Sequence, residues 1–243
     1  MSSAFFRFKQ FTVWHDRCAM KVGTDGVLLG AWCPLSTLST CGLQQTPRVL
    51  DVGTGSGLIA MMIAQRTNWH VHIDAIDIEL DTVEQAMYNF AHSPWANILH
   101  VHHSTLQDWK AQKYDLIVSN PPYFQNSLKN PNTQRATARH TDSLHYDELI
   151  VHSAQLLQEN GLLAMVLPIE AENEILSLGK QEGLCPTYIT HVHPKPGKPA
   201  KRLLIALKRA SESDICIPQT FYIESMHSPR SEEYQALTQN FYL

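Results

Sequence analysis

The sequence predicts an α/β protein built on a doubly wound, seven-stranded, mostly parallel sheet. Short apolar, β-branched runs recur along the chain, and the first of them, at residues 49–52, leads through a glycine-rich turn into a helical run. Such runs, alternating with amphipathic helical patterns, are typical of βαβ units. The run at 114–119 stops at two prolines, which cannot donate to a sheet ladder and therefore mark a sharp strand end. The seven expected strands span residues 49–52, 71–77, 98–102, 114–119, 162–167, 187–193 and 202–208.

Length and composition fit one such domain with a small extension. The chain has 243 residues, of which 44% are hydrophobic, enough for a sizeable core. The net charge of -4 argues weakly against a nucleic-acid partner, because such proteins usually carry a basic face. The five cysteines are odd in number and none are paired at metal-ligand spacing, which favours reduced thiols in a cytoplasmic protein. We expect neither a secretory leader nor a membrane span.

Residues 1–47 are expected to form an N-terminal extension. Residues 5–15 mix aromatic and basic side chains, which indicates an extended or hairpin-like start. Thr24 or Asp25 would cap a short helix that runs to about Trp32. This helix would either pack as a plain amphipathic element or act as a lid, with Lys21, Thr24 and Asp25 near a cofactor. The residues by themselves favour the plain helix.

The strongest cofactor signal follows a surface loop expected at residues 34–47. The first strand leads into a helical run at 58–65 through a turn made of Gly53, Thr54, Gly55, Ser56 and Gly57. Strand, glycine turn and helix form a nucleotide-binding βα unit, because glycines let the backbone approach a ligand closely. Leu58 stands where a dinucleotide fingerprint needs a third small residue, and no P-loop lysine follows. A tight turn without a ligand is the alternative interpretation.

The next two strands add polar groups at the same edge of the sheet. Asp77 ends the second strand roughly 20 residues past the glycines, where a ribose-binding carboxylate is expected. A capping role is the alternative for Asp77, but Asp81 fits the start of the helix at 81–92 better. Ser104 and Thr105 follow the third strand and are candidates for contacts with an adenine ring. Histidines near that strand lack acidic or Cys partners at useful spacing, so no metal site is expected. The helix should bury one apolar face, made of Val83, Ala86, Met87, Phe90 and Ala91.

The candidate catalytic stretch is Asn120-Pro121-Pro122-Tyr123, directly after the fourth strand. The Asn120 side-chain carbonyl and the Pro121 backbone carbonyl would accept the two N–H groups of a planar amine. They would thereby stabilise the positive charge that develops as the amine is methylated. Pro122 helps to keep the strand end rigid, and Tyr123 would stack on a flat substrate. Asn-Pro and Pro-Pro are also common turn signals, so a plain strand-ending turn is the alternative.

Two basic segments are candidates for contacts with RNA. Residues 124–143 lack periodicity, and loops this long inside compact domains are usually functional or disordered, so we expect a substrate loop that orders on binding. The other segment connects the last two strands, where prolines keep the loop stiff. Both carry positive charge that would meet phosphates, although an ordinary solvated loop is the alternative for each. The candidate side chains are Lys129, Arg135, Arg139, Lys195, Lys198, Lys201 and Arg202.

Helices are also expected at residues 145–159 and 170–181. Residues 210–243 would form a C-terminal extension packed on the domain of residues 48–209. It holds an edge strand at 221–223 and a short helix at 231–239, and we assign it no chemistry.

The glycine loop, Asp77 and the Asn120 quartet together resemble class I S-adenosylmethionine-dependent methyltransferases that act on planar amino groups. Residues 5 to about 208 are similar to a bacterial family that methylates the exocyclic amine of the adenosine just 3′ of the anticodon in a valine tRNA. The stretches that carry this closer match are residues 21–32, 51–57, 120–124 and 201–203.

The resemblance implies a Rossmann-like sheet with strand order 3-2-1-4-5-7-6 and an antiparallel last strand. It implies S-adenosylmethionine as cofactor and tRNA as partner of a cytoplasmic monomer without metal. Asp51 and the glycine loop would line the methionine end of the cofactor, Asp77 would take its ribose, and residues 21–25 would close over it. The implied cofactor-binding set is Lys21, Thr24, Asp25, Asp51, Gly53, Thr54, Gly55, Ser56, Gly57, Asp77, Ile78, Ser104, Thr105 and Asn120.

Three alternative functions remain open at this point. Methylation of a protein glutamine would suit the quartet equally, but such enzymes carry a sizeable helical domain before the glycine loop, and here about 48 mainly loop-like residues precede the first strand. An adenine in DNA or ribosomal RNA is a closer rival. An inactive cofactor-binding module that scaffolds RNA is the alternative without catalysis, and the intact Asn120 and Pro121 argue against it.

Overall fold

The computed structural model describes residues 3–35, 38, 46–68, 70–122, 144–209 and 216–243. Its strands are β1 Phe5–Arg7, β2 Thr12–Trp14, β3 Arg48–Val52, β4 His72–Asp77, β5 Leu99–His103, β6 Tyr114–Ser119, β7 Leu157–Pro168, β8 Leu184–His193, β9 Arg202–Arg209 and β10 Gln219–Tyr222. Its helices are α1 Thr24–Trp32, α3 Leu58–Thr67, α4 Leu80–Ala91, α6 Tyr146–Leu156, α7 Glu172–Gln181 and α8 Glu232–Thr238, with a 3-10 turn, η1 Ile169–Ala171, before α7.

The molecule is organised around a sheet in the order β10-β8-β9-β7-β6-β3-β4-β5. The seven predicted strands correspond to β3 through β9, and their order along this sheet is the expected 3-2-1-4-5-7-6. The last of them, β9, is antiparallel to both β7 and β8, as predicted. The strand count of seven is wrong, because β10 pairs in parallel with β8 and extends the sheet to eight. The strands β1 and β2 form a separate antiparallel pair.

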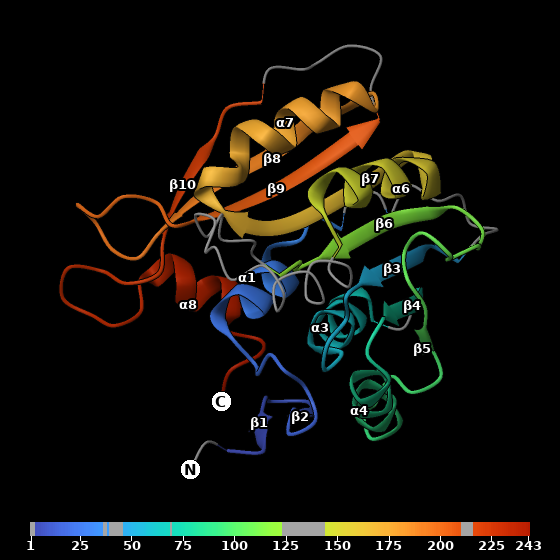
Figure 1. The fold of residues 1–243 in the computed structure, drawn as a ribbon. Coiled ribbons are helices and arrows are strands. Elements are labelled where there is room, and N and C mark those ends of the chain that lie inside the picture. Colours follow the sequence, from blue (N-terminus) through green and yellow to red (C-terminus); the bar gives the residue numbers. More distant parts are fainter. Residues whose placement is uncertain (1–2, 36–37, 39–45, 69, 123–143, 210–215) are drawn as a thin grey trace, which may run out of the picture.

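Helices cover both faces of the sheet, as a doubly wound fold requires (Figure 1). Alternate residues of the buried strand β7 point to opposite faces, because side chains alternate along a strand. Leu162, Ala164 and Val166 pack into one core together with α1, α3 and α4. Leu163, Met165 and Leu167 pack into the other, together with α6 and α7.

Two predicted helix caps are wrong. The N-cap of α1 is Gly23, and neither Thr24 nor Asp25 caps the helix with its side chain. The N-cap of α4 is Glu79, while Asp81 lies in the first turn. The reason for the second difference is that Asp77 Oδ1 accepts a hydrogen bond from the Glu79 amide at 3.1 Å, which closes the turn after β4 and lets the helix begin before Asp81.

The buried face of α4 also differs from the prediction. Met87 is 55% exposed and Ala91 is exposed as well. The polar residues Gln85 and Asn89 are buried instead, at 4% and 1% exposure. They face the N-terminal segment around β2, whose backbone supplies their hydrogen-bond partners.

The N-terminal and C-terminal segments of the chain lie near each other, below α1 in the view of Figure 1. The backbone amide of Lys9 donates to Phe241 O at 2.8 Å, and the rings of Phe8 and Tyr242 stack with centroids 5.9 Å apart. Phe241 itself is only 2% exposed. The C-terminal segment is therefore part of the core rather than a loose tail.

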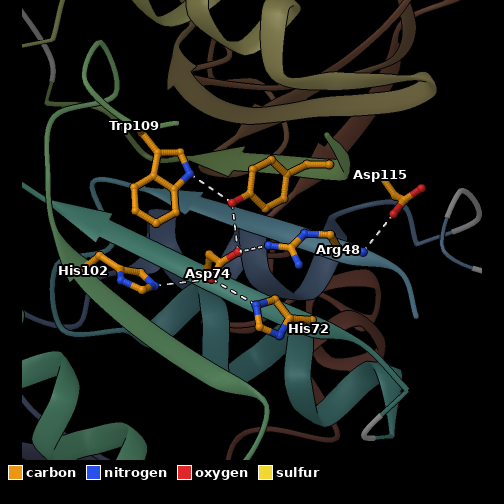
Figure 2. A network of polar contacts seen from close by, with 7 residues as sticks. Arg48, His72, Asp74, His102, Trp109 and Asp115 are labelled. Atoms are coloured by element: carbon orange, nitrogen blue, oxygen red, sulfur yellow. Dashed lines mark hydrogen bonds and ion pairs between the residues drawn. The ribbon is translucent and has the colours of Figure 1, made fainter. Parts of the chain in front are cut away.

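A polar network anchors the amino-terminal ends of the central strands, opposite the edge discussed below (Figure 2). Asp74 accepts hydrogen bonds from Arg48 Nη2 at 2.7 Å, from Tyr114 OH at 2.9 Å and from His72 Nε2 at 3.1 Å. Burial alone would raise the pKa of Asp74, but the Tyr114 hydrogen bond and the charges of His72 and Arg48 outweigh it and lower that pKa. The network therefore holds a buried carboxylate in its charged form.

Within the described residues, no helix has the length and apolar character to cross a bilayer. The same residues contain no group of three or more His, Cys, Asp or Glu side chains that could hold a metal ion.

Candidate active site

Three strand ends meet at the carboxyl edge of the sheet. Val52, the last residue of β3, pairs with Ile76 on one side and with Ser119 on the other. The residues that follow these three positions therefore lie side by side: they are Gly53, Asp77, which is the last residue of β4, and Asn120. Because the chain passes from β3 to β4 on one side and reaches β6 on the other, this edge is the switch point where ligands bind in open α/β sheets.

The glycine loop presents bare backbone to this edge. Gly53 and Gly55 have φ values of 68° and 58°, a left-handed conformation that favours glycine. Apart from its chain neighbours, a Cβ atom added to either glycine would meet no atom of the described residues within 4 Å. The amides of Gly53 and Thr54 both donate to Ile76 O at 3.0 Å and fix the loop to β4. The space in front of the two glycines is thus open, and a ligand can lie directly against their backbone.

Asp51 lies behind this loop and is fully buried. Its Oδ2 accepts hydrogen bonds from Thr54 Oγ1 at 2.7 Å and from the Ala60 amide at 3.2 Å. Its buried Oδ1 has no hydrogen-bond partner among the described residues. Burial raises the pKa of Asp51 to about 7; the two hydrogen bonds oppose this rise, and the charge of Asp77 adds to it. An orphaned carboxylate oxygen of this kind suits a cationic ligand group nearby, which would stabilise its charged form.

Asp77 is held at the end of β4 by the chain on both sides of it. Its Oδ2 accepts from the Gly55 amide at 2.9 Å and its Oδ1 from the Glu79 amide at 3.1 Å. A carboxylate has about four acceptor sites, so both oxygens retain capacity for hydroxyl donors. The neighbouring Ile78 is 41% exposed, an apolar surface beside an acceptor pair. This combination suits a ribose with an attached base.

Ser104 and Thr105 follow β5 at the same edge. Both are partly exposed, but their hydroxyl groups make local bonds: Ser104 Oγ donates to Thr105 O at 2.9 Å, and Thr105 Oγ1 donates to Asp108 Oδ2 at 2.9 Å. Their place beside β4 is the expected one, and their hydroxyl groups stabilise the loop in this structure.

The Asn120 stretch leaves β6 next to the glycine loop. Ser119 Oγ donates to Val52 O at 2.9 Å and ties the end of β6 to the end of β3. Pro121 is buried, whereas Asn120 is partly exposed and Pro122 is exposed. Asn120 Nδ2 lies 3.9 Å from Met20 Sδ, so the N-terminal segment reaches the candidate catalytic amide. Tyr123 lies outside the described residues.

The predicted lid residues lie close to this edge but differ in surroundings. Lys21 and Thr24 are exposed. Asp25 is partly buried and its Oδ2 accepts from Arg202 Nε at 2.9 Å. The ion pair connects α1 to the start of β9, so Arg202 has a structural partner within the described residues.

The loop between β8 and β9 carries the remaining described RNA candidates. Lys195, Lys198 and Lys201 are all exposed. The loop is shaped by its own backbone, because the Lys198 amide donates to Lys195 O at 3.1 Å and the Lys201 amide donates to Val192 O at 2.9 Å. Lys129, Arg135 and Arg139 lie outside the described residues.

Sequence reasoning missed Asn89, a buried residue that touches the site. Asn89 of α4 donates through Nδ2 to Ser56 O in the glycine loop at 2.8 Å. The available signal was the pair Gln85 and Asn89, two amides one helical turn apart next to apolar positions. Amides in such positions are buried only where they find partners.

Comparison with known proteins places the chain in a family. The model of the methyltransferase small domain family matches residues 30–178. A tRNA1(Val) (adenine(37)-N6)-methyltransferase of Parabacteroides distasonis is 46% identical, over 100% of this chain and 99% of that protein. A protein of the same name from Phocaeicola vulgatus is 45% identical over 100% of this chain and 99% of its own length.

Solved structures share the fold at much lower identity. A predicted O-methyltransferase from Agrobacterium tumefaciens matches with a TM-score of 0.65 and 17% identity, over 89% of this chain and 96% of that one. A putative class I S-adenosylmethionine-dependent methyltransferase from Listeria monocytogenes matches with a TM-score of 0.59 and 13% identity, over 87% of this chain and 67% of that one. The chain therefore has a class I methyltransferase fold and belongs to the family of tRNA1(Val) (adenine(37)-N6)-methyltransferases.

Proposed function

We propose that this protein transfers a methyl group from S-adenosylmethionine to the exocyclic N6 amine of adenosine 37 in tRNA1(Val). The observation that carries the proposal is the position of Asn120, which leaves β6 beside Gly53 of the open glycine loop. The names of the full-length relatives supply the nucleic acid and the position of the base. The protein would act as a cytoplasmic monomer.

The residues at the strand ends fit the cofactor. The backbone of Gly53 and Gly55 would lie against its methionine part, with the Asp51 carboxylate behind the loop, and Asp77 would accept hydrogen bonds from its ribose hydroxyls. Ile78 would pack against the adenine ring. When bound, S-adenosylmethionine supplies an electrophilic methyl group on a positively charged sulfur. The residues that extend this set are Lys21, Thr24, Asp25, Thr54, Ser56, Gly57, Ser104 and Thr105.

Asn120 and Pro121 would prepare the amine of the base. The lone pair of an exocyclic amine is delocalised into the ring, which makes it a poor nucleophile. The Asn120 side-chain carbonyl and the Pro121 backbone carbonyl would each accept one N–H, turn the lone pair toward the methyl group and stabilise the positive charge that develops. Pro122 stiffens the turn and Tyr123 would stack on the base. A base within a tRNA loop must swing out of its stack to reach this position.

The tRNA backbone would meet the basic loop between β8 and β9. Lys195, Lys198 and Lys201 are exposed on a protein of net charge -4. Within the described part of the chain, none of the three forms an ion pair with an acidic side chain. They would be joined by Lys129, Arg135 and Arg139 of the segment after Asn120.

We propose three parts: an N-terminal extension with a lid at 1–47, a methyltransferase domain at 48–209 and a packed C-terminal extension at 210–243.

Methyl transfer from labelled S-adenosylmethionine tests the proposal directly. Unmethylated total tRNA and total protein extract are offered separately, and the tRNA is then digested to nucleosides. We expect label in N6-methyladenosine from tRNA1(Val). Label only in protein would replace the tRNA reading with methylation of a protein side chain, and label only in ribosomal RNA or DNA would move the target to another nucleic acid.

Replacement of Asn120 tests the chemistry. Asn120→Ala should lower kcat by about two orders of magnitude, roughly 3 kcal/mol, because one preorganised acceptor is lost. The dissociation constant of the cofactor, measured by calorimetry, should stay within about threefold. A kcat within about threefold of wild type would show that Asn120 does not polarise the amine.

A further inference from the structure

We infer that Asn89 is a positioning residue that joins the N-terminal segment to the cofactor loop. The segment concerned, called the strap here, comprises residues 14–23 and runs from the end of β2 to the start of α1. The inference rests on the proposed function, because it assigns to Asn89 a part in binding S-adenosylmethionine.

Asn89 uses its whole amide to connect two parts of the chain. Its Oδ1 accepts from the Trp14 amide at 3.0 Å, and its Nδ2 donates to Trp14 O and to Ser56 O, both at 2.8 Å. Asn89 is 1% exposed; its bond to Ser56 O is buried, and its two bonds to Trp14 are partly buried. A backbone N–H donor on one side and two carbonyl acceptors on the other allow a single orientation of the amide. A buried group that satisfies three backbone atoms fixes their relative positions.

The same helix supports the glycine loop at a second point. A Cβ atom on Gly57 would lie 2.4 Å from Cε1 of Phe90, the residue that follows Asn89. Gly57 therefore packs its backbone directly against the Phe90 ring. Asn89 and Phe90 together hold the far end of the loop, while Gly53 and Gly55 face the open space.

The strap leads from Asn89 to the candidate catalytic amide. The Arg17 amide donates to Gln85 Oε1 at 3.3 Å, and the Val22 amide donates to His15 Nδ1 at 3.4 Å. Met20 then reaches Asn120, with Sδ 3.9 Å from Nδ2. The strap thus contacts Asn89, which supports the cofactor loop, at its first residue, and it contacts Asn120 near its other end. Asn89 is the residue that fixes the strap to the loop.

Loss of the Asn89 amide should weaken cofactor binding more than catalysis. Without it, the carbonyls of Trp14 and Ser56 lose the Asn89 donor, and the strap and the loop are free to move independently. Asn89→Ala should raise the dissociation constant of S-adenosylhomocysteine by about tenfold or more, the size expected for two buried hydrogen bonds. The kcat at saturating cofactor should stay within about threefold of wild type.

Gln85→Ala is the matched control. Gln85 is a buried amide one turn earlier on α4 and binds the strap at Arg17, without a described bond to the glycine loop. It should change the dissociation constant by less than about threefold. Equal effects of the two substitutions, or no effect of Asn89→Ala, would overturn the inference, because the junction with Ser56 would then add nothing. Melting temperatures verify that both variants are folded.

A measurement on the wild-type chain keeps the test independent of variant folding. In hydrogen exchange, S-adenosylhomocysteine should slow exchange at Trp14 and Val22 of the strap as well as at the glycine loop. Protection confined to the loop would overturn the inference.

In the free protein, trypsin should cut Asn89→Ala at Arg17 or Lys21 faster than wild type, and unchanged cleavage would count against the inference. Absence of any binding by wild type would instead overturn the proposed function, and this inference with it.

Discussion

Adding a side chain at Gly55 would affect both the stability of the fold and the binding of a ligand, and a second glycine allows the two effects to be told apart. The φ of Gly55, 58°, is left-handed, and a Cβ there would enter the open space in front of the loop. Gly183, at the end of α7, is also left-handed at 70° and also has nothing near its Cβ position. The two positions share the same backbone constraint, but only Gly55 lies at the candidate active site.

We predict different outcomes for alanine at these two positions. Both Gly55→Ala and Gly183→Ala should cost about 1 kcal/mol of unfolding free energy, because a side chain is strained in this conformation. Only Gly55→Ala should also weaken S-adenosylhomocysteine binding by about tenfold or more, a change of about 1.4 kcal/mol. Urea denaturation and calorimetry measure the two effects. Equal ligand affinity in the two variants would mean that the ligand does not lie against Gly55.

Asp51 should make stability depend on pH in an unusual direction. Its pKa rises from 3.8 to about 7 in the folded protein because the carboxyl is buried. Between these values the folded state binds the proton more than the unfolded state does, so this group destabilises the fold progressively as pH rises from about 4 to about 7. Most buried carboxylates with several donors, such as Asp74, act in the opposite sense.

Asp51→Asn should remove this dependence. The amide oxygen retains the bonds from Thr54 and Ala60, and its new NH2 group adds a cost that does not vary with pH. The unfolding free energy of the variant minus that of wild type should therefore increase by at least about 1.4 kcal/mol, one pKa unit, between pH 5 and pH 7. Urea denaturation of the free protein across this range measures the difference. A constant difference would contradict a raised pKa at Asp51.

At the scale of elements, α1 and β9 are connected by a partly buried ion pair. Asp25 and Arg202 come from distant parts of the sequence, and their side chains are 24% and 32% exposed. The pair fixes the helix of the predicted lid to the strand that carries the basic loop. A pair that remains partly open to solvent contributes little, because solvent screens it.

A double-mutant cycle with Asp25→Asn and Arg202→Gln should give a coupling energy below about 1 kcal/mol for unfolding. The coupling should decrease further in high salt, since the pair is partly solvated. Denaturation of the four proteins at two salt concentrations provides the numbers. A coupling of several kcal/mol would show that the pair is far better shielded than its exposure indicates.

The elements also show which patterns in the sequence are informative. The β-branched runs predicted β3 through β9, because a buried parallel strand is recognisable from its own residues. The helix α4 was predicted, but its buried face was not, since Met87 is exposed and Asn89 is buried. The polar residues of that face bind backbone atoms of Trp14 and Ser56, and such partners cannot be read from the helix itself. The predicted caps of α1 and α4 were wrong as well.

At the scale of the molecule, the site was predictable where chain order and chemistry coincide. Asp51, Gly53, Asp77 and Asn120 all lie at or directly after strand ends, so a parallel sheet brings them together. The edge strand expected at 221–223 overlaps β10, but it was not counted in the main sheet, because β10 holds only four residues and depends on β8 for its pairing. The strap contacts at Trp14 and Met20 were missed, since they join residues far apart in sequence. Only the end of the strap, at residues 21–23, was expected to close over the cofactor.

The whole-molecule charge predicts a salt-dependent interaction with tRNA. The chain carries a net charge of -4, so attraction to phosphates must come from local clusters such as Lys195, Lys198 and Lys201. Each lysine that meets a phosphate should contribute about 0.7–0.9 to the slope of log affinity against log salt. Alanine at each of the three should reduce the slope by about that amount, as measured by titration at several salt concentrations.

Lys110→Ala is the control for this series. Lys110 is exposed but precedes β6, at the opposite end of the sheet from the basic loop. It should leave the slope unchanged. Equal reductions at Lys110 and at the three loop lysines would show that the tRNA responds to overall charge rather than to this loop.

The position of β8 in the sheet has a consequence for synthesis on the ribosome. Both neighbours of β8, β9 and β10, follow it in the chain. The strands of the glycine-loop half, β3 to β7, can pair as they emerge, whereas β8 must wait with two unpaired edges until later segments are translated. Unpaired edges promote association between nascent chains. A ribosome that stalls near the 3′ end of the message would thus release a chain with a nearly complete cofactor half and an aggregation-prone strand.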